Sequence, residues 1–158
     1  MVFALLSLAA VVAAPLVPGV PPAAVAVSHI EDCIAASKAG GADFALLEQR
    51  GWVSAHATVD HGKKGPFEIY TRPNDMSFLG AFGAGRDAGR CFVLLPTPAP
   101  ADVAAIRTAL GRPAEGPPSP PSEAAESWTV PSHRLTLVPI GNAQARGLKV
   151  TVIPLEKK

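Results

Sequence analysis

The sequence predicts an α+β fold: a mostly antiparallel sheet with an N-terminal helix and one central helix packed on it. Stretches in which apolar and polar residues alternate follow one another through short polar turns, as they do in hairpins. Two other segments place their apolar residues at helical spacing. Because the strands are joined mainly by short antiparallel connections, a doubly wound parallel sheet is not expected.

The first helix is expected over residues 28–41, with the sequence SHIEDCIAASKAGG. Ser28 can accept a hydrogen bond at its N-terminus, and Glu31, three residues later, completes a capping box. Ile30 and Cys33 then fall on one face, which would lie against the sheet. The two glycines at the end of the segment are typical of a helix stop.

Two further helical segments follow. Asp43 can cap a short helix over residues 44–51. The clearest helix covers residues 97–111, TPAPADVAAIRTALG, because proline lies in its first turn and glycine follows its end. Its apolar stripe consists of Val103, Ile106 and Leu110.

The expected strands lie on both sides of that central helix. In residues 52–59, WVSAHATV, small apolar residues occupy every second position from Val53 on. They alternate with Trp52, Ser54 and the residues that follow at the same spacing, which predicts a half-buried strand. The segment RCFVLLP is apolar on both faces, as is typical of a central strand. The remaining expected strands cover residues 67–72, 76–83, 127–132, 134–141 and 147–156.

The chain divides into four parts by composition. Residues 1–26 form an expected leader, and residues 27–111 an α+β core. Residues 112–127 are rich in proline and predict a linker or an exposed loop. Residues 128–158 hold three short strands, which are marginal alone and are expected to complete the same domain.

The N-terminal segment predicts export. Residues 1–26 contain no charged side chain, and Ala24-Val25-Ala26 has the small–x–small pattern that signal peptidase needs. Several prolines interrupt the apolar run before it reaches the length of a membrane span. We therefore expect a cleaved signal peptide and a periplasmic or secreted protein. The alternative is an uncleaved anchor, and membrane contact is expected only in that case.

Cys33 and Cys91 are the two cysteines of the chain. In an exported protein a pair of cysteines most often forms one disulfide bond. A helix face carrying Cys33 could lie on the strand that begins at Cys91. Closing that loop of about 59 residues would stabilise the fold by about 4 kcal/mol on the chain-entropy model.

The charge balance argues against nucleic acid as a partner. Fourteen Lys and Arg oppose thirteen Asp and Glu, which leaves a formal charge of +1, and no basic stripe emerges. The glycines of GAFGAGRDAG are spaced one residue too far apart for a dinucleotide fingerprint, and a strand follows where a helix would be needed. No cofactor is therefore expected.

The histidines do not form a convincing metal site. His56 lies on a strand, whereas His61 lies beyond the strand end in a turn with two lysines, which oppose a cation. His133 follows Ser132 and has no evident acidic partner for catalysis. No metal site and no catalytic residues are therefore expected.

Six side chains remain as candidates for binding a ligand or partner. Three aromatic residues lie on separate expected strands, two arginines flank the loop before RCFVLLP, and one histidine lies beside an aromatic residue. These candidates are Trp52, His56, Tyr70, Arg86, Arg90 and Trp128.

The sequence therefore favours an exported, disulfide-stabilised binding or accessory module with an unknown extracytoplasmic protein or small ligand as its partner. A small hydrolase or metal-assisted enzyme using His56, His61 or His133 is one alternative. The other is a membrane-tethered subunit that keeps its N-terminal segment.

Overall fold

The computed structural model describes residues 22–55, 64–96, 100–111, 125–141 and 146–155. Its strands form one seven-stranded antiparallel sheet in the order β1-β2-β3-β4-β7-β6-β5. Together with three helices, this is the α+β fold expected from the sequence. The strands are β1 (Val53–Ser54), β2 (Phe67–Thr71), β3 (Phe78–Phe82), β4 (Cys91–Pro96), β5 (Glu126–Val130), β6 (His133–Gly141) and β7 (Arg146–Pro154).

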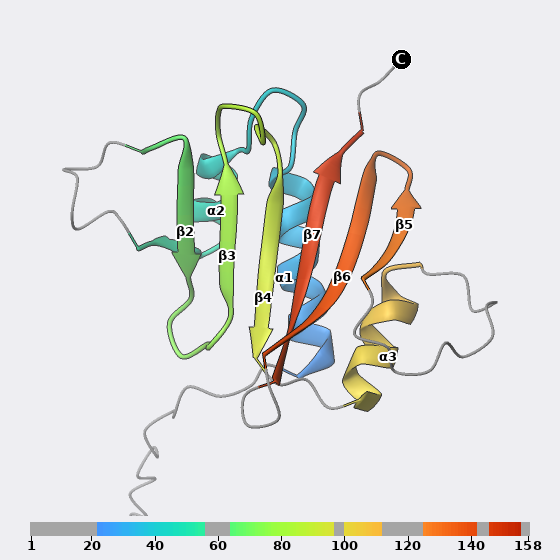
Figure 1. The fold of residues 1–158 in the computed structure, drawn as a ribbon. Helices are drawn as coiled ribbons and strands as arrows, with labels where there is room; N and C mark the ends of the chain where they lie inside the picture. The colour runs from blue at the N-terminus through green and yellow to red at the C-terminus, as the bar shows by residue number, and fades with distance from the viewer. Residues whose placement is uncertain (1–21, 56–63, 97–99, 112–124, 142–145, 156–158) are drawn as a thin grey trace, which may run out of the picture.

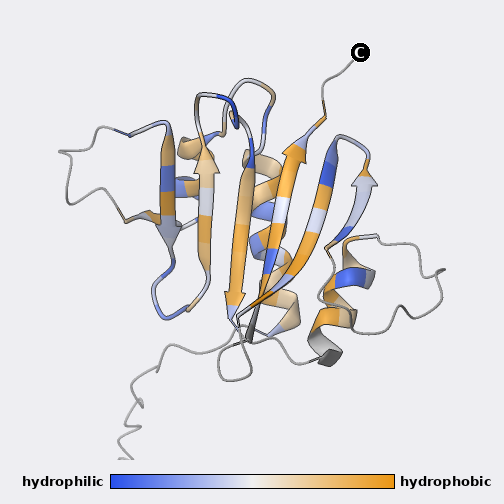
Figure 2. Cartoon of the chain, viewed as in Figure 1, coloured by the Kyte–Doolittle hydropathy of each residue, from blue (hydrophilic) through white to orange (hydrophobic). Residues whose placement is uncertain are grey.

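The sheet is joined at its centre by strands that are far apart in the sequence. β4 and β7 pair from Cys91 opposite Val152 to Pro96 opposite Gly147. The three C-terminal strands therefore extend the meander formed by the first four. Both central strands are hydrophobic along most of their length (Figure 2). In β4, alternate side chains are buried and half-buried, so apolar residues lie on both faces of the sheet there.

Three helices accompany the sheet: α1 (Ala23–Ala36), α2 (Phe44–Gln49) and α3 (Pro100–Ala109). α1 and α2 lie behind the sheet as seen in Figure 1, and α1 packs mainly on β4. α3 packs against α1. None of the described helices has the length and apolar character that a membrane-spanning helix needs.

α1 begins earlier than expected. Its N-cap is Pro22 and not Ser28, which lies inside the helix, so the predicted capping box is wrong. The residues before Ser28 are mainly alanine, the best helix former, and Ala26 is buried against the sheet. The expected peptidase cut between Ala26 and Val27 therefore falls inside the first turns of α1.

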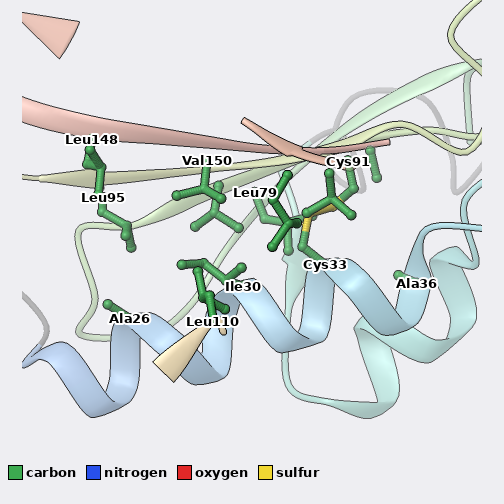
Figure 3. Close-up of a cluster of buried hydrophobic side chains, with 14 of the residues drawn as sticks. Ala26, Ile30, Cys33, Ala36, Leu79, Cys91, Leu95, Leu110, Leu148 and Val150 are labelled. Atoms are coloured by element: carbon green, nitrogen blue, oxygen red, sulfur yellow. A yellow bond between two sulfur atoms is a disulfide. The ribbon is translucent and has the colours of Figure 1, made fainter. Parts of the chain in front are cut away.

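The inner face of the sheet and one face of α1 form the core. Ala26, Ile30, Cys33 and Ala36 follow one another at helical spacing and point toward the strands (Figure 3). Complete burial of a side chain such as Ile30 contributes about 2 kcal/mol. The core also contains inward residues of the central strands and the end of α3: Leu79, Val93, Leu95, Ile106, Leu110, Leu148 and Val150.

The predicted disulfide bond is confirmed. Cys33 of α1 and Cys91 of β4 are bonded, with their Cα atoms 5.7 Å apart and both side chains fully buried. The bond fixes the helix to the central strand on which it lies (Figure 3).

Two strand assignments differ from expectation. In the expected strand 52–59, Val53 is 53% exposed and Trp52 is 2% exposed, so the described members of the apolar set, Val53 and Ala55, do not face the core. Residues 56–59 lie outside the described part of the chain. β1 itself covers two residues. At the other edge of the sheet, β5 begins at Glu126, inside the segment expected to be a linker. Residues 112–124 of that segment lie outside the described part of the chain.

Candidate functional site

The two faces of the sheet differ in what covers them. Residues paired across antiparallel strands point to the same side, so the pairing register sorts side chains into rows. One row runs from Tyr70 through Leu79 and Val93 to Val150, and it is buried under α1 and α2. The next row points to the opposite side. We call that side the open face, because no described helix packs on it (Figure 1).

An aromatic cluster lies on the open face. Phe67 and Phe82 are paired residues of β2 and β3, with ring centroids 4.6 Å apart. Phe92 of β4 lies 6.1 Å from the ring of Phe67 and 6.5 Å from the ring of Phe82. Phe78 is on the same face and is 47% exposed. Four of the six phenylalanines of the chain therefore lie on a surface that the helices leave uncovered.

A glycine lets the cluster lie flat. Gly80 is the cross-strand partner of Phe92, and a Cβ atom placed on it would stand 2.3 Å from Cζ of that ring. The ring therefore occupies the space above the backbone of β3. Ile69 pairs with Gly80 on its other side, and Leu94 pairs with Phe78, which extends the apolar surface over β2, β3 and β4.

Beyond the aromatic residues the open face becomes cationic. The ammonium group of Lys149, on β7, lies 4.7 Å from the ring centroid of Phe92. Arg134 of β6 is exposed on the same face. The neighbouring outward positions are hydroxyl or apolar residues, and the cross-strand partners of Lys149 are Leu94 and Val138. None of the outward positions of the described strands is aspartate or glutamate.

Trp52, a predicted ligand contact, is instead buried on the helix side. Its indole Nε1 donates to Oδ2 of Asp32, 2.9 Å away, and the guanidinium of Arg72 lies 4.8 Å from its ring. Asp32 also accepts from Nη1 of Arg50 and Nη2 of Arg72, each at 2.7 Å. One buried carboxylate thus joins α1 to the segments before β1 and after β2. The role of Trp52 here is structural.

His29 lies beside this cluster and is almost completely buried. Its ring packs edge-on against Trp52 with centroids 5.0 Å apart. Nε2 is 3.2 Å from Oδ2 of Asp75, although the pair lacks the alignment of a hydrogen bond. Burial lowers the pKa of His29 more than the carboxylate of Asp75 raises it, and Arg72 lowers it further. Folding therefore favours the neutral form of this imidazole.

Tyr70 is also a predicted contact that the structure buries completely. Its hydroxyl has no hydrogen-bond partner among the described residues. Burial, aided by the carboxylates of Glu48 and Glu68, raises the pKa of Tyr70 above its ordinary value. Glu68 accepts from the hydroxyl of Ser54 and from the backbone N–H of Gly65. Trp52 and Tyr70 therefore do not form an exposed face.

The other predicted contacts lie apart from one another. Trp128 is half-buried at the opposite edge of the sheet, where its Nε1 donates to the carbonyl of Leu110. Arg86 is exposed in the loop between β3 and β4, and Arg90 in the same loop pairs with Asp87 at 3.0 Å. The structure does not gather these side chains into one site.

The predicted histidine candidates fall into two groups. His56 and His61 lie outside the described residues. His133 is buried at the start of β6, where its Nε2 contacts the carbonyl of Ser37 at 2.8 Å and its Nδ1 contacts the hydroxyl of Ser132 at 2.8 Å. Because a carbonyl only accepts, Nε2 carries the proton. This imidazole ties β6 to the end of α1.

A depression in the described structure adjoins His133. It has a volume of about 430 Å³ and a mainly apolar lining from α1, the end of α3 and the β5–β6 turn. Ser132 and His133 lie on its rim, and Glu31 is the charged residue there. No group of three or more metal-ligating side chains occurs in the described part of the chain.

Comparisons of this chain with protein-family models, with curated proteins and with solved structures gave no match. The functional argument therefore rests on the fold and its surfaces. The outward residues of β2, β3 and β4 were not among the predicted contacts. The signal for them is the run RCFVLLP, whose apolar residues on both faces leave one apolar set in need of a cover.

Proposed function

We propose that this chain is an exported binding module, periplasmic or secreted, that holds an extracytoplasmic partner on the open face of its sheet. The observation that carries the proposal is the aromatic cluster of Phe67, Phe78, Phe82 and Phe92 on the face of the sheet that no described helix covers. A contiguous apolar patch of this kind on a protein surface typically marks an interaction site.

Export is supported by the disulfide bond and by the uncharged segment at the N-terminus. Disulfides persist in oxidising compartments and are rare in a reducing cytosol. A leader cut after Ala26 would remove a buried residue from α1. We therefore place the cut before Ala23, so that the whole helix remains in the mature protein.

Intact mass of the protein from the exported fraction tests this part of the proposal. We expect a chain that begins before Ala23 and takes up no alkylating agent until a reductant is added. A full-length chain with two alkylatable thiols would contradict export. A chain beginning at Val27 would support export but contradict the proposed position of the cut.

Photocrosslinking in the producing cells tests the binding face. We would place benzoylphenylalanine at position 78, where it replaces an exposed phenylalanine, and at position 49 as the control. Gln49 is exposed on α2, on the helix side of the sheet. We expect one adduct of defined mass from position 78, whose purified partner binds the wild-type protein but not the Phe78→Ser variant. Equal adducts from both positions, or none from position 78, would rule out the open face.

A further inference from the structure

We infer, on the basis of the proposed function, that the partner presents an acidic amphipathic helix to the open face. The helix would place apolar side chains on the aromatic cluster and carboxylates beside Lys149. The inference follows from the charge, the width and the flatness of this face.

Charge gives the first argument. Lys149 lies on β7, next to β4, and Arg134 lies on β6, one strand further from the aromatic cluster. The outward positions of the described strands contain no carboxylate to pair with them. Lys149 touches Phe92, so a partner that covers this ring also covers the ammonium group. Burying a cation without an acceptor is costly. The partner is therefore expected to bring carboxylates to this side of the cluster.

The same charges argue against a second copy of this chain. In a symmetric dimer each open face would meet its own duplicate. The cations Lys149 and Arg134 would then be enclosed between faces on which no outward position of a described strand is acidic. Such an interface leaves like charges uncompensated. A different, acidic partner has no such cost.

Width indicates a helix. The aromatic cluster covers β2, β3 and β4, and adjacent strands are about 4.8 Å apart, which gives a strip about 10 Å wide. One α-helix with its side chains is about 10–12 Å in diameter. The five and six residues of β3 and β4 extend for about 17–20 Å. A helix of about 12 residues matches that length.

Flatness favours a packed protein surface over insertion into a bilayer. The three ring centroids lie within 6.5 Å of one another, and Phe92 rests in the space that Gly80 leaves free. The side chains of Phe67, Phe82 and Phe92 are half-buried, because their rings cover one another and the backbone of β3. Rings in this arrangement offer area for packing and little depth for insertion.

A selection experiment identifies the chemistry that the open face binds. A displayed library of random peptides of about 14 residues is panned on the disulfide-bonded full chain after depletion on the Phe78→Ser variant. Phe78 is exposed, so this variant is expected to fold. We expect the enriched peptides to carry apolar residues at helical spacing and an excess of Asp and Glu.

Charge reversal then tests the proposed contact. Lys149→Glu should weaken binding of an enriched peptide by about tenfold or more, and the loss should shrink at high salt. The matched control is Lys38→Glu, which makes the same change in net charge at an exposed lysine that follows α1 and pairs with Asp43. We expect that control to change affinity by less than about twofold.

Every other outcome overturns the inference. Enrichment of basic or uncharged peptides, no enrichment at all, or equal loss in Lys38→Glu would exclude an acidic helix. Cosedimentation with phosphatidylglycerol vesicles that is lost in Phe78→Ser would indicate a membrane surface, and a dimer lost in the same variant would indicate a second copy. The crosslink at position 78 is independent of the library, so the proposed function can stand when this inference fails.

Discussion

The ring of Phe92 lies over the α-carbon of Gly80 on the adjacent strand, in space that any other residue would fill with its Cβ. This contact lets the ring of Phe92 lie over β3, where it reaches the rings of Phe67 and Phe82 on the open face. It also links a backbone feature of β3 to the shape of the proposed binding face.

The Gly80→Ala variant tests that contact. A Cβ at this position would stand 2.3–2.9 Å from three atoms of the Phe92 ring, so the ring must move outward. Because the ring is only half-buried, we expect a loss of about 1 kcal/mol in the free energy of unfolding, measured by denaturant titration. The matched control is Gly65→Ala, whose Cβ has ordinary contacts of 3.6 Å or more. Equal effects in the two variants would show that the ring is not held in this position.

Asp32 is the centre of the buried polar cluster, and its replacement tests the cluster. In Asp32→Asn an amide replaces the carboxylate, so Arg50 and Arg72 lose the anion that accepts from them. One of the two acceptor oxygens is also lost, and the indole of Trp52 must compete for the other. Since Arg50 is partly exposed, we expect a loss of about 2–4 kcal/mol rather than more. Denaturant titration measures it. Glu31→Gln, next to it on the exposed side of α1, should change stability by less than about 0.5 kcal/mol.

The disulfide bond should account for a large part of the stability. The double variant Cys33→Ser, Cys91→Ser removes a link across 58 residues, and we expect a loss of about 2–5 kcal/mol. Adding a reductant should bring the wild-type protein to a similarly reduced stability. The reductant should leave the double variant unchanged. Detection of two free thiols in the wild-type protein before a reductant is added would contradict the disulfide bond.

The hydrophobic patterns of the sequence predicted which helices and strands form more reliably than where each of them begins and ends. The disulfide could be predicted because Cys33 falls on an apolar helix face and Cys91 begins an apolar strand. The start of α1 could not, because the alanines around Ala26 fit both a cleavage site and a helix. Only the burial of that residue against the sheet distinguishes the two.

The binding face was harder to predict because alternation does not say which side of a strand is covered. In β2, Phe67 and Ile69 alternate with Glu68 and Tyr70, and hydropathy alone would place the first pair inside. The structure buries the second pair. Glu68 is satisfied by Ser54 and by the backbone of the turn before β2. These partners depend on tertiary structure, so the apolar residues that remain outside could be identified only from the fold.

His29 should make the stability of the protein depend on pH. Burial lowers its pKa below the value of 6.5 expected for the unfolded chain, with Asp75 opposing that effect and Arg72 and Asp32 also facing the ring. The unfolded state therefore binds a proton first as the pH falls. The stability gained from a neutral His29 is complete above about pH 6.5 and is lost on acidification below it.

The measurement is the free energy of unfolding of wild type and of His29→Gln at a series of pH values from about 7.5 to about 5. For each protein the free energy of unfolding is plotted against pH, and the slopes of the two plots should differ by at most about 1.4 kcal/mol per pH unit, the value for one proton. The wild-type protein should have the steeper loss, because glutamine does not titrate. Parallel curves for the two proteins would show that folding does not shift the pKa of His29, and a loss of stability as the pH rises would show that folding raises it.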